Sequence, residues 1–153
     1  MSASGLRELL ARTPLRVRRA PHALASWPPA LAPLLAAQLV TLAAREAGPG
    51  GGGLVFWCVD ERELSALLPQ SALPALPAPT RCERDWAAIT LDADMAWDVS
   101  GVLAAVSGAL AAAGIPIGAV TAFSRDHVLV PRARLPDALA ALAGLCGEVR
   151  ADG

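Results

Sequence analysis

The chain contains no lysine, no asparagine and no tyrosine among its 153 residues, and all 13 of its basic residues are arginine. A Schiff-base mechanism and a P-loop both require a lysine, so the sequence excludes these two kinds of site. The three missing residue types share AT-rich codons. A GC-rich genome therefore explains the bias without any functional cause.

Cysteine and histidine are also scarce. Cys58, Cys82 and Cys146 are widely spaced, form no C-x-x-C pair and do not cluster with the two histidines. This pattern predicts neither a disulfide framework nor a zinc site, and it favours free buried thiols in a reducing cytoplasm. The chain also has no nucleophile elbow, metal triad or dinucleotide-binding fingerprint. The sequence thus predicts a cytoplasmic protein that is not an enzyme and needs no cofactor or metal.

Charge is low and balanced, with a formal net charge of −1 and a pI near 6.1. A nucleic-acid partner calls for a clustered basic face, so we expect none. Hydrophobic residues make up 54% of the chain, which is long enough for one domain or for two small modules of roughly 70 residues. The N-terminus lacks the apolar run of a secretory signal, while a transit peptide stays open.

An uncharged stretch, residues 99–123, is long enough to cross a bilayer, but its pattern argues against a membrane span. Its large apolar residues fall on one helical stripe: Val102, Leu103, Val106 and Leu110. Gly114 and the following Ile115-Pro116 end the helix after about 15 residues, which is too short to span. Residues 115–123 then predict a buried strand.

The flanking segments extend this pattern into a β-α-β-β-α-β order. We expect strands at 85–92, 127–131 and near 147–151, and a second helix at 135–145. This order is the ferredoxin-like plan, in which two helices pack on one face of a four-stranded antiparallel sheet. The predicted fold class is therefore α+β.

The N-terminal half predicts a weaker version of the same plan. The pattern indicates strands at 15–20, 37–46 and 53–61, a helix at 61–68, and no more than a helical turn at 30–36. The glycines at 50–53 precede a strand rather than a helix, so we interpret them as a flexible hairpin connection and not as a phosphate loop. The prolines of residues 69–84 indicate a linker. The predicted division is an N-terminal module (1–68), this linker (69–84) and a C-terminal module (85–153).

Four features in the C-terminal half carry a family resemblance. They are Trp86 at the start of a strand, the DVSGVL turn at 98–103, the GIP helix exit at 114–116 and the DHVLVP strand at 126–131. In this order they resemble the C-terminal ACT module of the CASTOR-type tandem-ACT family, which includes an arginine sensor. The resemblance implies two ferredoxin-like ACT modules and an amino-acid-binding regulatory protein, with its ligand at the interface of the modules. It also implies a regulated protein partner and allows a homodimer.

The same residues suggest where a ligand would bind. Ser100, Gly101 and Val102 begin a helix, whose unpaired N–H groups and dipole suit a carboxylate. The strand end would supply Thr121, Ala122 and Phe123 as a wall, with Asp126 accepting an ammonium or guanidinium group. Asp98 completes the predicted ligand-binding set.

Several of these residues have a structural alternative. Asp98 could be the helix N-cap or its neighbour, and Asp126 could pair with Arg125 or Arg132. We interpret His127 as a half-buried core residue, and the four tryptophans as residues that pack the modules. The alternative function is a ligand-free interaction module that uses the edges of its sheets.

Overall fold

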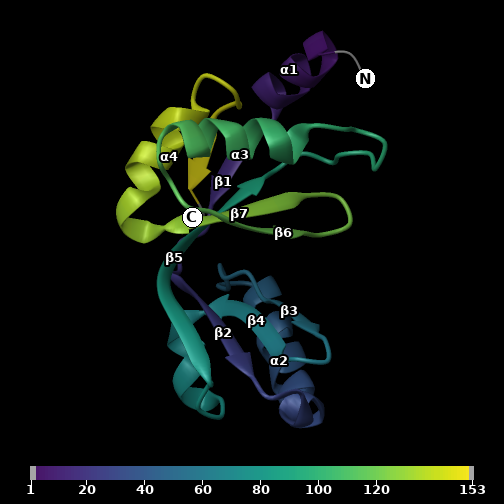
Figure 1. Ribbon diagram of the computed structural model, residues 1–153, viewed down its shortest axis with the longest axis vertical. Helices are drawn as coiled ribbons and strands as arrows, with labels where there is room; N and C mark the ends of the chain where they lie inside the picture. Colours follow the sequence, from purple (N-terminus) through teal and green to yellow (C-terminus); the bar gives the residue numbers. More distant parts are fainter. Residues whose placement is uncertain (1–2, 152–153) are drawn as a thin grey trace. The chain divides into compact units, whose positions relative to one another are not determined.

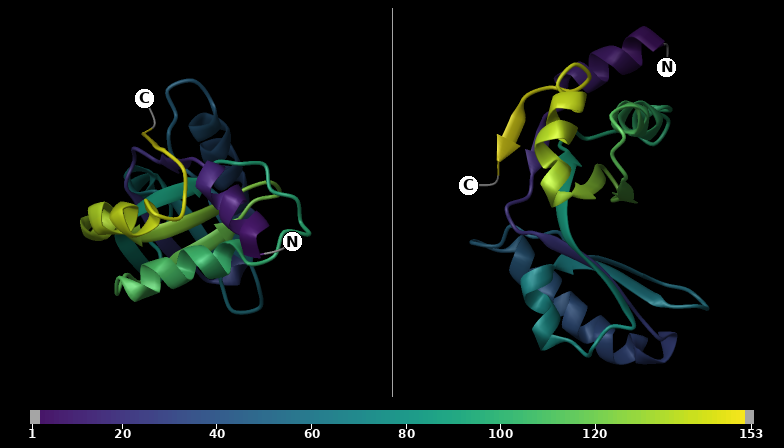
Figure 2. Two further views of the ribbon diagram at one scale, coloured as in Figure 1. Left: turned by 90° about the horizontal axis from the view of Figure 1, so that it is seen from above. Right: turned by 60° about the vertical axis from the view of Figure 1, so that its left-hand side comes forward.

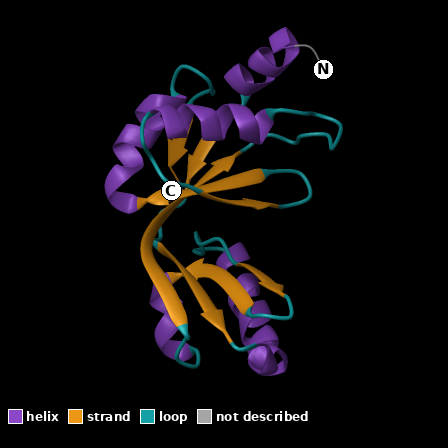
Figure 3. Ribbon diagram, viewed as in Figure 1, coloured by secondary structure: helices purple, strands orange, loops and turns teal. Residues whose placement is uncertain are grey.

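The computed structural model describes residues 3–151, and the chain divides into two compact units. The inner unit comprises residues 18–86, and the terminal unit comprises residues 1–17 with 87–153. Each unit is an open sheet of mainly antiparallel strands covered by helices (Figures 1 and 3). The predicted α+β class with two ferredoxin-like modules is confirmed.

The inner unit has a β-α-β-β-3₁₀-β order. Its elements are β2 (His22–Trp27), η1 (Pro29–Leu31), α2 (Ala32–Ala47), β3 (Phe56–Val59), β4 (Leu64–Pro69), η2 (Gln70–Ala75) and the first part of β5 (Arg81–Leu91). The strands lie in the order β3-β4-β2-β5, which is that of a ferredoxin-like sheet. The short η2 stands where the plan has its second helix.

Two predicted elements of the inner unit are wrong. Residues 37–46 belong to helix α2 and not to a strand, because Leu35, Leu39 and Leu42 form a buried stripe at helical spacing. The prolines of the preceding segment argued against a long helix. The helix nevertheless has a proline in its first turn, where the backbone N–H that proline lacks would have no partner within the helix. Residues 64–69 form strand β4 and not a helix, since Leu64, Ala66 and Leu68 alternate toward the core.

The glycine run joins a helix to a strand and is held in place, contrary to the flexible hairpin connection expected. Glu46, near the end of α2, accepts hydrogen bonds from the Gly53 N–H at 3.0 Å and from the Gly52 N–H at 3.5 Å. A Cβ at Gly51 would lie 2.1 Å from the Glu46 carbonyl oxygen, whereas a Cβ at Gly52 would meet nothing within 4 Å. The missing side chain at Gly51 lets the chain turn tightly against the helix end.

Gly51→Ala should therefore destabilise the protein while Gly52→Ala should not. We expect Gly51→Ala to lower the free energy of unfolding by about 1–3 kcal/mol, because the backbone of Glu46 must move to admit a methyl group. Gly52→Ala, one residue away, should stay within about 0.5 kcal/mol of the parent. Urea unfolding followed by circular dichroism measures both. Equal effects of the two variants would contradict the close approach at Gly51.

The terminal unit contains the predicted C-terminal elements and two further ones from the N-terminus, but the strand expected to be buried at 115–123 is shorter, Gly118–Thr121, and is partly exposed. The elements of the unit are α1 (Ala3–Arg12), β1 (Leu15–Val17), the later part of β5, α3 (Val102–Ala112), β6 (Gly118–Thr121), β7 (Asp126–Pro131), η3 (Arg132–Arg134), α4 (Leu135–Leu142) and β8 (Val149–Ala151). Its strands lie in the order β6-β7-β5-β1-β8. Strand β1 is thus inserted between the first and last strands of the β-α-β-β-α-β plan, antiparallel to β5 and parallel to β8.

The core of the terminal unit lies between α3, α4 and one face of this sheet (Figure 2). Val106 and Leu110 of α3 and Leu142 of α4 pack with residues of β5 and β7, including Ile89 and Val130. Within the described residues, only the run Pro29–Ala47 has the length and composition of a membrane span. Its inward leucines belong to the core of the inner unit.

The units differ from the predicted modules in two places. Residues 15–17, which were predicted to belong to the N-terminal module, lie in the terminal unit. Their strand β1 pairs there with residues 89–91 and 149–151. The expected linker 69–84 is folded, since it contains η2 and the start of β5. The Nε1–H of Trp27 donates a hydrogen bond to the Pro77 carbonyl at 2.8 Å and so fixes this Pro-rich segment.

Candidate functional site

A hollow of about 240 Å³ lies in the terminal unit at the N-terminal end of α3, and we call it the terminal hollow. It is formed by the loop between β5 and α3, the first turn of α3 and the turn between β6 and β7. Its lining residues are Met95, Ala96, Trp97, Val99, Val102, Leu103, Thr121, Ala122, Phe123, Ser124, Arg125 and Asp126. This volume is below the range of about 300–1,000 Å³ that is usual for pockets of drug-sized ligands, so the hollow has room only for a smaller molecule.

Backbone hydrogen bonds hold the two loops of the terminal hollow together. The Met95 N–H donates to the Ser124 carbonyl at 3.0 Å, which ties the β5–α3 loop to the β6–β7 turn. The Ala122 N–H donates to the Arg125 carbonyl at 2.9 Å and closes that turn. Main-chain hydrogen bonds therefore hold the walls in place, and the side chains on these loops line the hollow.

Two exposed aromatic side chains form part of the lining. The rings of Trp97 and Phe123 meet edge to face, with centroids 5.9 Å apart and planes at 61°. Trp97 is 70% exposed and Phe123 is 84% exposed. Exposed apolar groups of this size mark interaction surfaces. Trp97 thus departs from the prediction that the tryptophans pack the modules, whereas Trp27 is fully buried as expected.

Asp126 begins β7 and provides the acid of the terminal hollow. Its Oδ1 accepts a hydrogen bond from the Thr121 hydroxyl at 2.8 Å. Arg125 pairs instead with Asp92, at 3.1 Å, and among the described side chains no cation pairs with Asp126. The predicted alternative of an ion pair between Asp126 and Arg125 or Arg132 is therefore not formed, although Arg125 lines the same hollow. His127 is buried, and its Nδ1 lies 2.9 Å from the Thr90 hydroxyl.

The start of α3 differs in one respect from the sequence prediction. The N-cap residue is Gly101, in the left-handed region at φ 93°, and no side chain caps the helix. Asp98 lies three residues earlier, in a turn closed by the Val99 N–H and the Ala96 carbonyl at 3.1 Å. Asp98 is therefore not the N-cap. The first-turn N–H groups, which begin at Val102, keep the donor capacity that a side-chain cap would have used.

Five of the eight predicted site residues line the terminal hollow, namely Val102, Thr121, Ala122, Phe123 and Asp126. Asp98, Ser100 and Gly101 are exposed beside it and do not line it. Sequence reasoning missed the loop residues 95–97, because an irregular loop has no periodicity from which its direction can be predicted. The exposed Trp97 was the available signal, since a tryptophan within an acidic, strand-free segment is seldom a core residue.

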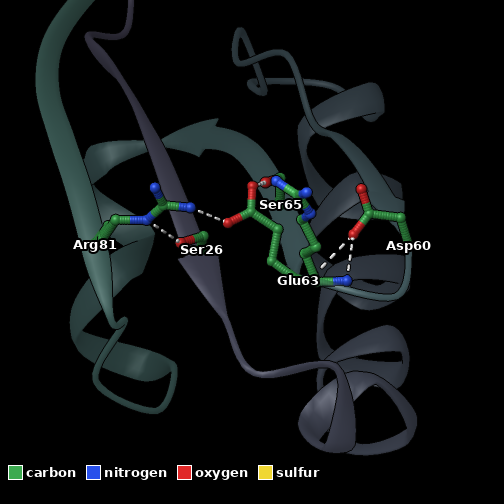
Figure 4. Close-up of polar contacts among 6 residues, drawn as sticks. Ser26, Asp60, Glu63, Ser65 and Arg81 are labelled. Carbon is green, nitrogen blue, oxygen red and sulfur yellow. Dashed lines mark hydrogen bonds and ion pairs between the residues drawn. The ribbon is translucent and has the colours of Figure 1, made fainter.

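A second polar cluster lies on the inner unit, around Glu63 (Figure 4). Glu63 accepts a hydrogen bond from the Ser65 hydroxyl at 2.7 Å and pairs with Arg81. The Ser65 bond, and then the Arg81 bond, hold the pKa of the Glu63 carboxyl below its ordinary value. Asp60 accepts from the N–H groups of Arg62 and Glu63, which lowers the pKa of Asp60. These bonds shape the β3–β4 turn and the strand surface beside it.

The candidate metal ligands and the thiols of the described residues are scattered. Residues 3–151 contain no group of three or more His, Cys, Asp or Glu side chains that could hold a metal ion. The three cysteines are free; Cys58 is exposed, contrary to the prediction of buried thiols, while Cys146 is buried. Burial raises the pKa of the Cys146 thiol to about 11, so it stays protonated at neutral pH.

Comparison with known proteins identifies one domain and a shared fold. Residues 81–144 match the model of the ACT domain. A search of curated proteins gave no match. Among solved structures, a protein from Agobacterium tumefaciens has a TM-score of 0.68 at 23% identity, over 93% of this chain and 95% of its own. A protein of unknown function from Vibrio cholerae, described as a possible transport protein, has a TM-score of 0.60 at 21% identity, covering 93% and 97%.

The fold also occurs in a protein with a described role. The regulatory subunit of aspartate kinase from Thermus thermophilus, in its ligand-free form, has a TM-score of 0.57 at 21% identity. The match covers 88% of this chain and 98% of that subunit. At these identities the likeness is one of fold. The chain therefore contains an ACT domain at residues 81–144, within a fold that it shares with a regulatory subunit of aspartate kinase.

Proposed function

We propose that the protein is a non-catalytic sensor of the tandem-ACT type, similar to the CASTOR-type family, which binds an amino acid in the terminal hollow and regulates a protein partner. The observation that carries this proposal is the pairing of two features in one small hollow. One is the carboxylate of Asp126, with which no described cation forms an ion pair, and the other is the uncapped first turn of α3.

The chemistry of these two features matches the two ends of an amino acid. A carboxylate is stabilised at a helix N-terminus by free N–H groups and by the helix dipole. An ammonium or guanidinium group forms charge-assisted hydrogen bonds with an aspartate. The rings of Trp97 and Phe123 would cover the aliphatic part of the ligand. The ACT-domain match and the fold shared with a regulatory subunit support the same role.

The direct test is a thermal-shift screen of the whole chain against the twenty amino acids. A true ligand at about 100 times its dissociation constant should stabilise the protein by about 2.7 kcal/mol. We expect one amino acid, or a chemically related group, to give a saturable rise in melting temperature. A screen in which none does so would contradict the proposal and favour the ligand-free module. That alternative has one supporting observation: β6 ends its sheet and pairs only with β7 among the described strands.

Asp126→Asn should weaken binding of the amino acid that the screen identifies, while Asp98→Asn should not. The first variant removes a charge from the terminal hollow, and loss of a charged hydrogen bond costs about 1.5–3 kcal/mol, or roughly 10- to 150-fold in affinity. Asp98 carries the same charge nearby but does not line the hollow. Isothermal titration of both variants gives the comparison. If both variants lost the same affinity, the effect would come from the overall negative charge near the hollow, and the assignment of Asp126 as a ligand contact would fail.

A further inference from the structure

Helix α1 is an addition to the β-α-β-β-α-β plan, and it lies beside the part of the terminal hollow that the proposed function assigns to a carboxylate. Figures 1 and 2 show α1 next to the beginning of α3. The contact is close, because a Cβ built at Gly101, the N-cap of α3, would lie 3.0 Å from Cδ2 of Leu6. Leu6 thus packs directly on the backbone from which the first turn of α3 begins.

The two halves of α1 are held in different ways. At its C-terminal end, Leu10 and the following Thr13 are fully buried, and the Thr13 carbonyl accepts a hydrogen bond from the Gly147 N–H at 2.8 Å. In the first half, Leu6 and Leu9 are partly buried against the core of the terminal unit. The end of α1 next to β1 is therefore anchored, and apolar side chains pack the half that lies beside α3.

The first turn of α3 depends on a neighbour for its shape. No side chain caps this helix, and its N-cap is a glycine with φ 93°, a conformation that glycine can leave at little cost. Among the described side chains outside residues 100–102, only Leu6 comes within 4 Å of the position of the missing Cβ of Gly101. The packing of Leu6 therefore helps to hold the N-cap in the conformation that directs the first-turn N–H groups.

Helix α1 in turn depends on being docked. It has 10 residues, and isolated helices shorter than about 12–15 residues are marginal in water. When α1 leaves the core it loses the contacts of its leucines, so it should also lose its helical hydrogen bonds. The exchange of its backbone amide hydrogens with solvent consequently reports how well it is docked.

We propose that α1 responds to ligand binding, because docking of α1 and binding of an amino acid in the terminal hollow stabilise each other through the contact of Leu6 with Gly101. Leu6 is a positioning residue, since it acts on the ligand through the N-cap of α3 and does not line the hollow. The inference rests on the proposed function, which places a ligand carboxylate at the start of α3. By linkage, the factor by which the ligand favours docked α1 equals the factor by which docked α1 favours the ligand.

The test is hydrogen–deuterium exchange of the whole chain, measured by mass spectrometry with and without an equimolar mixture of the twenty amino acids. We expect the mixture to slow exchange in residues 95–105, which include the β5–α3 loop and the first turn of α3. We also expect exchange in residues 7–12 of α1 to slow by about fivefold or more, the usual size of coupling between two sites. The upper limit is about 100-fold at about 100 times the dissociation constant, reached if the protein with undocked α1 binds no ligand.

The two ways of failing are distinguishable. Slower exchange in residues 95–105 with α1 unchanged would overturn this inference and leave the proposed function standing. Unchanged exchange in both segments would overturn the inference together with the proposed function.

Three substitutions separate this coupling from a merely structural role of α1. Leu6→Ala should abolish the effect of the mixture on residues 7–12 and should raise the concentration for half-maximal protection of residues 95–105 by about fivefold or more. Leu9→Ala removes the same side chain from a position that is also partly buried but does not pack on Gly101, so it should keep both responses. Leu6→Met keeps an apolar contact of similar volume and should behave as the parent does. Equal results for Leu6→Ala and Leu9→Ala would overturn the role of Leu6.

Discussion

Trp27→Ala should lower the free energy of unfolding by about 3–5 kcal/mol, the usual cost of removing a large aromatic side chain from a core. Trp27 is 1% exposed and packs with Leu35, Leu39 and Leu64 in the inner unit. The substitution also removes the donor that satisfies the Pro77 carbonyl at 2.8 Å. The lost hydrogen bond acts directly on the Pro-rich residues after η2, so we expect these residues to detach first.

The matched control is Trp97→Ala, which removes the same side chain from an exposed position. Because Trp97 is 70% exposed, its removal should change the free energy of unfolding by about 0.5 kcal/mol or less. Urea unfolding followed by circular dichroism compares the two without relying on tryptophan fluorescence. If Trp27→Ala costs no more than Trp97→Ala, the Pro-rich segment is not anchored as described.

Gly101→Asp should abolish amino-acid binding at the terminal hollow, with an affinity loss on the order of 100-fold. The new carboxylate would stand at the N-cap of α3, where it would compete with the carboxylate of the ligand for the same N–H groups. The position carries a backbone cost as well. Gly101 has a φ of 93°, and an added Cβ would lie 3.0 Å from Cδ2 of Leu6.

Gly101→Ala isolates the effect of the charge. It brings the same Cβ and the same backbone strain, so both variants should unfold about 1–2 kcal/mol more easily than the parent. Only the aspartate variant should lose binding, while the alanine variant should stay within a few fold of the parent. Titration with the amino acid from the thermal-shift screen measures this difference. Equal affinity in the two folded variants would remove the start of α3 from the site.

The C-terminal half was predictable from sequence because its signals are local. The stripe of Val102, Val106 and Leu110 specifies a helix by itself, and Gly114 with Pro116 ends it. In the N-terminal half, Leu35, Leu39 and Leu42 have helical spacing too, but the prolines of the preceding segment argued against a helix there. Their helical state depends on packing against β2 and β4, which lie at a distance in the sequence.

The site was predictable only in part for a similar reason. The residues at the β6–β7 turn, such as Thr121 and Asp126, could be predicted because the two strands that flank the turn were recognised from their sequence pattern. The contribution of residues 95–97 depends on a hydrogen bond between Met95 and Ser124, which joins loops 29 residues apart in numbering. The insertion of β1 beside β5 was not predictable either. A three-residue strand carries no sequence signal for its partner.

The position of β1 also has a consequence for the order in which the protein folds during synthesis. Residues 15–17 leave the ribosome before their partners: the antiparallel ones at 89–91 follow more than 70 residues later, and the parallel ones at 149–151 follow later still. The inner unit, by contrast, has its complete set of strands once residue 86 has emerged. Domains generally form as soon as their residues are available. The nascent chain therefore carries a folded inner unit and a strand β1 that stays unpaired until residues 89–91 emerge and gains its second neighbour only with residues 149–151.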